Sequence, residues 1–300
     1  MKRIILTLAF ASSVMFLFAQ ENRLLGKGSL GGYVEQRNMP CRLLEGHPQR
    51  DYSVYLPASY GQDETRTYPV LYLMHGGGEA HYVWETAGQL ATMADSLIAQ
   101  GQMQEMIIIC PEANKGYMMY FNSPSDNAPN APKWAYEDHF FEELIPFVES
   151  HYRVRTNRFS RAIAGFSMGG GAATVYGVHH PERFCFVGDI SGYQRRVHLE
   201  WLRNDPTGEW RQQVIEDNSP VRRLAEGNEA EVAAWRQVQW AIYVGDHDFT
   251  LPLNTELAQQ LRQLSIPYSM NVWPGDHNWQ FVRPALGEIL KKVSLRFAGH

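Results

Sequence analysis

Hydrophobic residues along the chain form short continuous runs that alternate with longer stretches of helical spacing. An uninterrupted apolar run is typical of a strand buried on both faces of a parallel sheet. We expect such strands at 69–74, 106–110, 162–164, 184–190, 238–244 and 268–273. Strands that alternate with helices predict a doubly wound sheet with right-handed crossovers. The predicted fold class is therefore α/β, with a mostly parallel sheet.

Helical periodicity occupies the intervals between these runs. We expect helices over 84–100, 136–152, 255–264 and 285–297. Pro146 is predicted to kink the second of them, because proline lacks the N–H that an interior helical position donates.

The segment from Arg23 to Tyr60 has a different pattern, with alternating polarity and frequent turn residues. This pattern predicts antiparallel strands at an edge of the sheet. Within it, Ser53 and Tyr55 alternate with Val54 and Leu56. We therefore expect one face of this strand to be exposed to solvent.

The first 19 residues differ from the rest of the chain in their pattern of charge and hydrophobicity. A basic pair at positions 2 and 3 precedes an apolar run over 4–18, and Ala19 follows. This is the pattern of a signal peptide over residues 1–19, which predicts a periplasmic or secreted protein with no membrane insertion after cleavage. We expect residues 20–300 to form a single domain, with the charged segment 194–237 as an insertion near the cleft.

Composition narrows the classes of partner. The chain of 300 residues is 44% hydrophobic and has a net charge of −5. No basic segment is present to bind nucleic acid, so a nucleic-acid partner is not expected. The cysteines Cys41, Cys110 and Cys185 are far apart, and we expect buried free thiols. With isolated cysteines and no H-E-x-x-H, the sequence has no zinc pattern, and no metal or other cofactor is expected.

A serine stands at the centre of the pattern G-x-S-x-G, Gly165-Phe166-Ser167-Met168-Gly169. An apolar run precedes it, and small residues that open a helical stretch follow it. Strand, sharp turn and helix is the context in which such a serine projects from the sheet as a nucleophile. The glycines allow the strained turn to form without clashes. Ser167 is the predicted nucleophile.

A serine hydroxyl needs a base and a carboxylate, and in this architecture they follow in the order acid, then histidine, each after a strand. His277 follows the last predicted strand through a short turn, and it is the predicted base. Asp246 and Asp248 both follow the strand at 238–244. We favour Asp248 as the acid, because Asp246 directly after a glycine is suited to shaping the turn.

Two backbone donors are needed to stabilise the oxyanion that forms on an attacked carbonyl. The N–H of Met168 is one candidate. The second is the N–H of Gly77, in the sequence His75-Gly76-Gly77-Gly78 that follows the strand at 69–74. The alternative interpretation of these glycines is a tight turn. A phosphate loop is not indicated, since the G-K-[ST] ending is missing.

Several of these segments together resemble the esterase D / feruloyl esterase family of α/β-hydrolases. They are Y-x-V-Y-L-P, V-L-Y-L-M-H-G-G-G, E-E-L-I-P-F-V-E-S-H-Y-R-V, A-G-F-S-M-G-G, G-D-H-D-F-T-L and P-G-D-H-N-W. The resemblance covers nearly all of 51–297. It implies an α/β-hydrolase fold and cofactor-free hydrolysis of carboxylic esters, often feruloyl or acetyl groups on plant cell-wall polysaccharide such as xylan. It also supports Asp248 as the acid and the pairing of Gly77 with Met168.

The same fold group leaves other activities open. An acyltransferase and a siderophore esterase are alternatives, and a non-catalytic carbohydrate-binding relative is a third. For the substrate pocket, a small-molecule or oligosaccharide ester would be held by a set of aromatic side chains and one carboxylate. The candidates are Glu79, Trp84, Tyr117, Tyr120, Phe121, Tyr193, Trp273 and Trp279. The alternatives are that these aromatics pack in the core or at its rim, and that Glu79 ties down its own loop.

Overall fold

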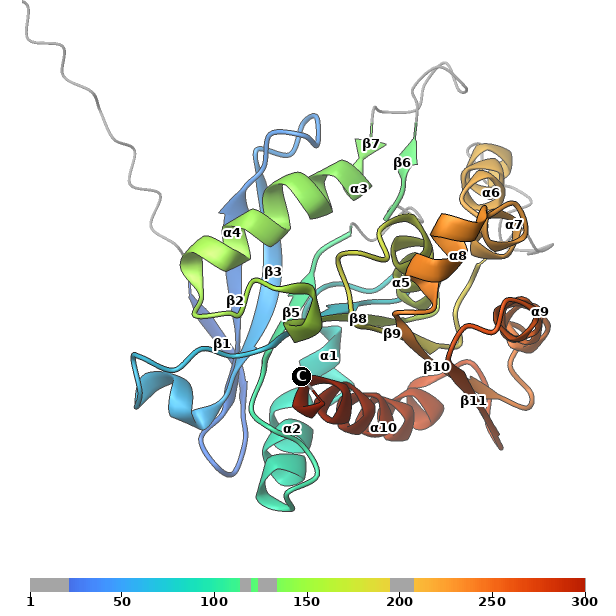
Figure 1. Ribbon diagram of the computed structural model, residues 1–300. Helices are drawn as coiled ribbons and strands as arrows, with labels where there is room; N and C mark the ends of the chain where they lie inside the picture. Colours follow the sequence, from blue (N-terminus) through green and yellow to red (C-terminus); the bar gives the residue numbers. More distant parts are fainter. Residues whose placement is uncertain (1–21, 114–119, 124–133, 195–207, 300) are drawn as a thin grey trace, which may run out of the picture.

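The computed structural model describes residues 22–113, 120–123, 134–194 and 208–299 (Figure 1). Within these residues, the chain is built on a nine-stranded sheet with the order β1-β2-β3-β5-β4-β8-β9-β10-β11. The strands are β1 (Arg23–Lys27), β2 (Tyr33–Pro40), β3 (Gln49–Leu56), β4 (Val70–Met74), β5 (Ile107–Pro111), β8 (Arg161–Phe166), β9 (Phe186–Ile190), β10 (Gln239–Gly245) and β11 (Tyr268–Trp273). A short hairpin of β6 (Asn122–Ser123) and β7 (Trp134–Ala135) lies apart from it.

The sheet combines a parallel part with an antiparallel edge. Strands β5, β4, β8, β9, β10 and β11 pair in parallel, while β1, β2 and β3 pair antiparallel and join the rest through β5. Every residue of β4, β5, β8 and β9 is buried. This burial on both faces explains why these strands are continuous apolar runs in the sequence. The predicted fold class is confirmed.

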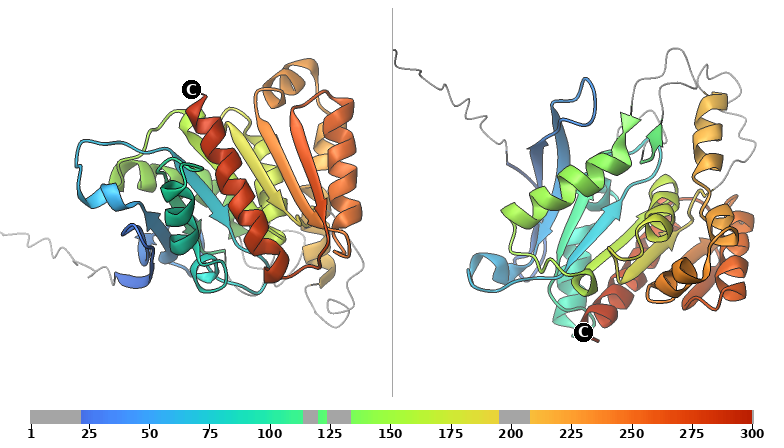
Figure 2. Two further views of the ribbon diagram at one scale, coloured as in Figure 1. Left: turned by 90° about the horizontal axis from the view of Figure 1, so that it is seen from below. Right: turned by 45° about the horizontal axis from the view of Figure 1, so that its top comes forward.

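Helices cover both faces of the sheet (Figure 2). Helices α2 and α10 pack in one hydrophobic cluster, and α4, α5, α7 and α9 pack in the other. The helical elements are η1 (Ala58–Gly61), α1 (Val83–Thr86), α2 (Leu90–Ala99), α3 (Tyr136–Asp138), η3 (His139–Leu144), α4 (Ile145–His151), η4 (Arg158–Ser160), α5 (Met168–His179), α6 (Gly208–Asp217), α7 (Pro220–Ala225), α8 (Glu229–Trp235), α9 (Leu251–Gln263) and α10 (Trp279–Ala298).

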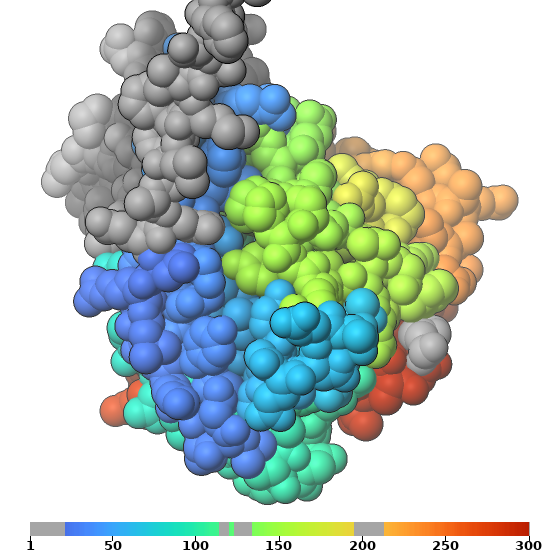
Figure 3. Space-filling model, turned by 90° about the vertical axis from the view of Figure 1, so that its left-hand side faces the viewer, coloured from blue at the N-terminus to red at the C-terminus, as the bar shows by residue number. Residues whose placement is uncertain are grey.

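The antiparallel edge, which faces the viewer in Figure 3, differs from the sequence-based prediction in its burial. Ser53 and Tyr55 are both buried, so the prediction that one face of this strand is exposed to solvent is wrong. Tyr55 donates a hydrogen bond of 2.9 Å to Asp95 of α2. The reason is that α2 packs on this face and gives the phenol a polar partner there.

Two predicted helices are interrupted. The helix expected over 84–100 divides into α1 and α2 at Gln89, which has a φ of 56°. A Cβ on the preceding Gly88 would lie 2.4 Å from the carbonyl oxygen of Trp84, so the chain turns at a place where only glycine fits.

The helix expected over 136–152 contains the π-helical turn η3. Pro146 follows this turn, at the second residue of α4, and α4 continues η3 without a break. The predicted irregularity is therefore a change in helix type, and it begins ahead of the proline.

The remaining predictions concern the cysteines, the membrane and the segments outside the described residues. Cys41, Cys110 and Cys185 are buried and free, as expected. None of the helices that the structure describes has the length and apolarity needed to cross a bilayer. The predicted signal peptide at 1–19 lies outside the described residues, and so does 195–207 of the predicted insertion, whose remaining part forms α6, α7 and α8.

Candidate active site

The loops that carry the predicted catalytic residues follow the carboxyl ends of parallel strands. Strands β4 and β8 are neighbours, and the chain leaves β4 toward β5 on one side and leaves β8 toward β9 on the other. In open α/β sheets, ligands bind beyond the carboxyl ends of the strands at such a switch point. The glycine loop follows β4 and Ser167 follows β8, which brings the two segments to this place.

Ser167 occupies the sharp turn between β8 and α5. Its φ of 54° and ψ of −116° are unfavourable for a residue with a side chain. Its N–H donates to the carbonyl of Ile190, and its carbonyl accepts from Gly171 and Tyr193, each at 2.9 Å. These bonds hold the turn in a conformation that presents the hydroxyl beyond the sheet.

The flanking glycines are required by contact. A Cβ on Gly165 would lie 2.3 Å from the carbonyl oxygen of Gly169, and one on Gly169 would lie 2.2 Å from that of Met74. Strand β8, helix α5 and the end of β4 are therefore packed backbone against backbone at this turn. The G-x-S-x-G pattern follows from this packing.

His277 contacts both Ser167 and Asp248, the other two predicted catalytic residues. Its Nε2 lies 2.8 Å from the Oγ of Ser167. Its Nδ1 lies 2.9 Å and 3.0 Å from the two carboxylate oxygens of Asp248. A neutral imidazole protonated at Nδ1 donates to the carboxylate and can accept the serine proton at Nε2.

Asp248 is built to remain ionised although its side chain is fully buried. One carboxylate oxygen also accepts from the backbone N–H and the hydroxyl of Thr250, both at 2.8 Å. Burial alone would raise the pKa of Asp248, but the hydrogen bond and electrostatic contact with His277 and the Thr250 N–H hold it below its usual range. Thr250, two residues beyond the acid, is a supporting residue that the sequence analysis did not single out.

Asp246 shapes the turn, which is the role that the sequence analysis favoured for it. Its carboxylate accepts the N–H of Gly275 at 2.9 Å and pairs with His247 at 2.8 Å. Asp246 therefore joins the turn after β10 to the loop that carries His277.

The predicted oxyanion donors lie at the starts of two loops. Met168 is the first residue of α5, where N–H groups have no partner within the helix. Within the described residues, neither the Met168 nor the Gly77 N–H donates to another protein group. Gly77 is exposed, and nothing lies within 4 Å of the place where its Cβ would be. Both donors are thus available to a bound carbonyl oxygen.

Glu79 ties down the glycine loop. It accepts the N–H of Gly76 at 2.8 Å and the indole N–H of Trp279 at 2.7 Å. This is the alternative interpretation of Glu79, and it leaves Trp279 half-buried beside the loop.

The structure contradicts the pocket prediction for three aromatics. Trp84 and Tyr120 are fully buried and Tyr193 is 2% exposed, so none of them presents a surface to a substrate. Tyr120 bonds to the backbone of His75, and Trp84 packs edge-on against Trp279. Tyr120 therefore supports the glycine loop, and Trp84 supports Trp279 at the start of α10.

The remaining aromatics of that set lie in different environments. Phe121 is also buried, Trp273 is half-buried and packs against Tyr243, and Tyr117 lies outside the described residues. Sequence reasoning missed Phe249, which is 48% exposed with its ring centroid 4.5 Å from that of His277. Its position next to the predicted acid is the signal that could have identified it.

Fold and geometry together define the class: the chain is an α/β-hydrolase with a serine at the sharp turn between β8 and α5. A family model described as "Putative esterase" matches residues 47–293, and the chain belongs to this esterase family. It is also similar to a solved ferulic acid esterase, with 34% identity, a TM-score of 0.79 and coverage of 89% of this chain and 98% of that one.

Two further relatives are more distant or longer. The solved feruloyl esterase module from Clostridium thermocellum, complexed with sinapinate, is 21% identical with a TM-score of 0.63, covering 91% of this chain and 90% of that one, and this likeness concerns the fold alone. An endo-1,4-beta-xylanase/feruloyl esterase of Xylanibacter ruminicola is 33% identical over 143 residues, 47% of this chain. The match spans only 19% of that relative's length.

Proposed function

We propose that this protein is a serine carboxylic-ester hydrolase that works through an acyl-enzyme. The observation that carries the proposal is the continuous contact from Ser167 through His277 to Asp248, with spacings of 2.8 Å and 2.9 Å. Family membership and the likeness to a ferulic acid esterase support the same reaction class.

The mechanism follows from the positions of these groups. The Oγ of Ser167 forms a bond to the ester carbonyl carbon while His277 Nε2 takes its proton, and Asp248 stabilises the imidazolium. The oxyanion is held by the N–H groups of Met168 and Gly77. Collapse breaks the bond to the alcohol, which leaves with the proton from His277. Water then attacks the acyl-enzyme in the same way, with His277 taking its proton and returning it to the Oγ of Ser167. This step releases the free acid and restores Ser167, so no cofactor is needed.

For the substrate, we propose a feruloyl, cinnamoyl or acetyl ester on plant cell-wall polysaccharide of the xylan type. The support is the similarity to a xylanase/feruloyl esterase and to a ferulic acid esterase, together with the exposed ring of Phe249 beside His277. An aromatic acyl group can pack against such a ring. The sequence of residues 1–19 supports a periplasmic or secreted location, where polymeric esters are accessible.

Turnover of methyl ferulate and p-nitrophenyl acetate by wild type and Ser167→Ala tests the reaction. We expect kcat to fall by at least about 10⁴-fold in the variant, while Ser150→Ala on α4 keeps wild-type activity. Mass spectrometry of the quenched wild type should find a feruloyl adduct on Ser167. Full activity of Ser167→Ala, or an adduct at another residue, contradicts the mechanism.

A substrate panel tests the finer proposal. Methyl ferulate, acetylated xylan and a siderophore ester are compared, with xylo-oligosaccharide added as an acceptor in a parallel series. We expect the first or the second to have the highest kcat/KM, with free acid as the product. Preference for the siderophore ester, or transfer of the acyl group to the acceptor in place of water, would favour the alternative functions.

A further inference from the structure

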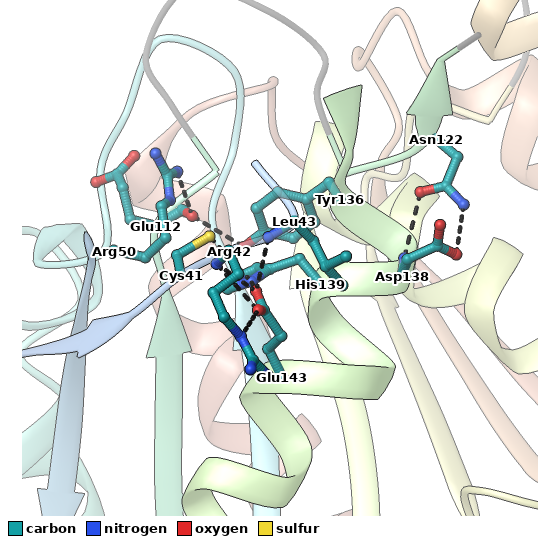
Figure 4. Close-up of polar contacts among 10 residues, drawn as sticks. All are labelled: Cys41, Arg42, Leu43, Arg50, Glu112, Asn122, Tyr136, Asp138, His139 and Glu143. Atoms are coloured by element: carbon teal, nitrogen blue, oxygen red, sulfur yellow. Dashed lines mark hydrogen bonds and ion pairs between the residues drawn. The ribbon is translucent and has the colours of Figure 1, made fainter. Parts of the chain in front are cut away.

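Three side chains with metal-binding atoms meet at the antiparallel edge of the molecule, on elements other than those that carry Ser167 (Figure 4). Cys41 directly follows β2, and His139 and Glu143 lie on the π-helical turn η3. All three are buried, with exposed fractions of 4%, 2% and 9%. Their Sγ, ring nitrogen and carboxylate oxygen lie within 4.8 Å of one another.

Both partners of His139 approach the same ring nitrogen. Its Nδ1 lies 3.4 Å from the Sγ of Cys41 and 2.8 Å from Oε2 of Glu143. A catalytic relay uses the two nitrogens on opposite sides of the ring, as His277 does. A single nitrogen has one proton or one lone pair in the ring plane and cannot relay a proton between two groups on its own side. The three ligand atoms also lie within 4.8 Å of one another, so a single ion could contact all of them.

The distances fit a small tetrahedral ion with these three protein ligands and a water molecule in the fourth position. With Zn–S near 2.3 Å and Zn–N near 2.0 Å, ligand atoms in a zinc site lie roughly 3.3–3.6 Å apart. The 3.4 Å separation of Cys41 Sγ and His139 Nδ1 already has this value. Glu143 would have to withdraw from the ring by about half an ångström, which a small side-chain rotation supplies.

The charges also favour a divalent cation. A neutral imidazole and a carboxylate offer lone pairs to a cation, and a thiol does so once its proton has left. The Glu143 carboxylate also contacts the Arg42 guanidinium, with Nε 3.4 Å from Oε1. When the metal has displaced the Cys41 proton, a thiolate, a carboxylate and a neutral imidazole together balance the charge of a 2+ ion, which lowers the cost of burying it.

Glu143 is oriented by groups around it. Its oxygens accept the backbone N–H of Arg42 at 2.9 Å and of Leu43 at 3.4 Å, bonds that hold the carboxylate toward Cys41 (Figure 4). Ligating carboxylates in metal sites are held by hydrogen bonds of this kind. The π-helical geometry of η3 is a second sign, because π-turns in α-helices are frequent at functional sites.

We propose that Cys41, His139 and Glu143 bind a zinc ion that fastens the segment after β2 to the π-helical turn η3. Binding displaces the thiol proton of Cys41, which leaves to solvent, and forms the sulfur–zinc bond. The ion is structural: it joins two segments 98 residues apart in sequence, and Figure 3 shows the blue N-terminal strands and the green helical segment side by side at this edge. The long separation explains why motif spacing predicts no metal.

Cobalt titration of the untagged full-length protein after chelator treatment tests the site. A cobalt–thiolate bond gives a charge-transfer band in the near ultraviolet, and zinc should abolish it by competition. We expect one equivalent of cobalt to produce the band in wild type and in Cys185→Ser, which alters another buried thiol. Cys41→Ser should lack the band. Absence of the band in wild type, or its survival in Cys41→Ser, overturns the proposal.

A second group must be separated from this one. Glu137 contacts His179 and His180 at 2.9 Å and 2.8 Å, and these three could also hold a metal. That group has no sulfur, so it cannot give the charge-transfer band, and His180→Gln should keep the band unchanged. Loss of the band in His180→Gln would also overturn the assignment.

Thermal unfolding gives a readout that does not depend on the Cys41 variant. A ligand at one hundred times its Kd should raise the Tm of wild type by roughly 5–10 °C. Glu143→Gln keeps the shape of the side chain and should lose most of this rise, while its Tm in chelator stays within a few degrees of wild type. An equal rise in both proteins contradicts the site.

Discussion

The indole Nε1 of Trp279 donates a 2.7 Å hydrogen bond to Glu79, whose second carboxylate oxygen accepts the N–H of Gly76 at 2.8 Å. One carboxylate thus joins the start of α10, two residues beyond His277, to the glycine loop after β4. The groups proposed to bind the oxyanion and to transfer the proton therefore have a common support.

Replacing Glu79 with alanine should lower kcat more than it raises KM. Both hydrogen bonds are lost, and the glycine loop no longer holds the Gly77 N–H in place. A hydrogen bond to a charged group contributes about 1.5–3 kcal/mol, so we expect kcat to fall by about tenfold or more. Steady-state kinetics on methyl ferulate measure this.

The matched control for this variant is Trp279→Phe, which keeps a ring and removes one donor. It should have a smaller effect on kcat than Glu79→Ala. An increase in KM alone for Glu79→Ala would instead indicate that this carboxylate contacts the substrate directly.

Asp248→Asn should reduce kcat by about 10⁴-fold with little change in KM. The asparagine amide would present an N–H to His277 Nδ1, which favours the tautomer that cannot accept a proton from Ser167. Asp246→Asn changes an aspartate two residues away that bonds to Gly275, and it should keep most of the activity. If the two variants exchanged these effects, Asp246 would be the acid.

The sequence was sufficient to predict the parallel core and the order of the three proposed catalytic residues. Strands buried on both faces must be apolar throughout, so β4 and β8 are recognisable without their neighbours. The carboxyl ends of parallel strands meet at one edge of the sheet, so residues that follow them converge. For this reason Ser167 and His277, 110 positions apart, could be paired from sequence.

Burial of individual polar and aromatic side chains was not predictable in this way. Tyr55 is buried because Asp95 of α2 supplies a partner, and Trp84 is buried because Trp279 covers it. Each of these depends on a residue distant in sequence that periodicity does not reveal. The same holds for Cys41 and His139, whose contact spans 98 positions.

Gly169→Ala should destabilise the fold, because the added Cβ would lie 2.2 Å from the carbonyl oxygen of Met74, and this backbone atom cannot move aside as a flexible side chain could. We expect a loss of about 3 kcal/mol, measured by denaturant unfolding. Gly77→Ala adds the same methyl group where nothing lies within 4 Å, so its stability should match wild type. Its kcat/KM for methyl ferulate should fall, because the methyl group projects where the ester approaches. Equal stability of both variants would contradict the packing described for the nucleophile turn.

Asp189 on β9 should make the protein less stable as pH rises toward 8. Its carboxyl is 1% exposed, and burial raises its pKa to about 8 despite the hydrogen bonds from Gly192 and Gln194. A folded pKa above the unfolded value of 3.8 means that the folded state binds the proton more tightly. This stabilisation is complete below the unfolded pKa and is lost as pH rises through the folded pKa.

Asp189→Asn keeps the shape of the neutral acid and removes the titration. The Tm of the variant should therefore fall less than that of wild type between pH 6 and about 8, with the difference widening continuously over that interval. Asp246→Asn is the control, since the pKa of that exposed carboxyl is lowered and the group is ionised throughout the interval. Parallel Tm curves for wild type and Asp189→Asn would mean that Asp189 is already charged at pH 6. The buried carboxylate would then need a cation or further donors that the Gly192 and Gln194 contacts do not supply.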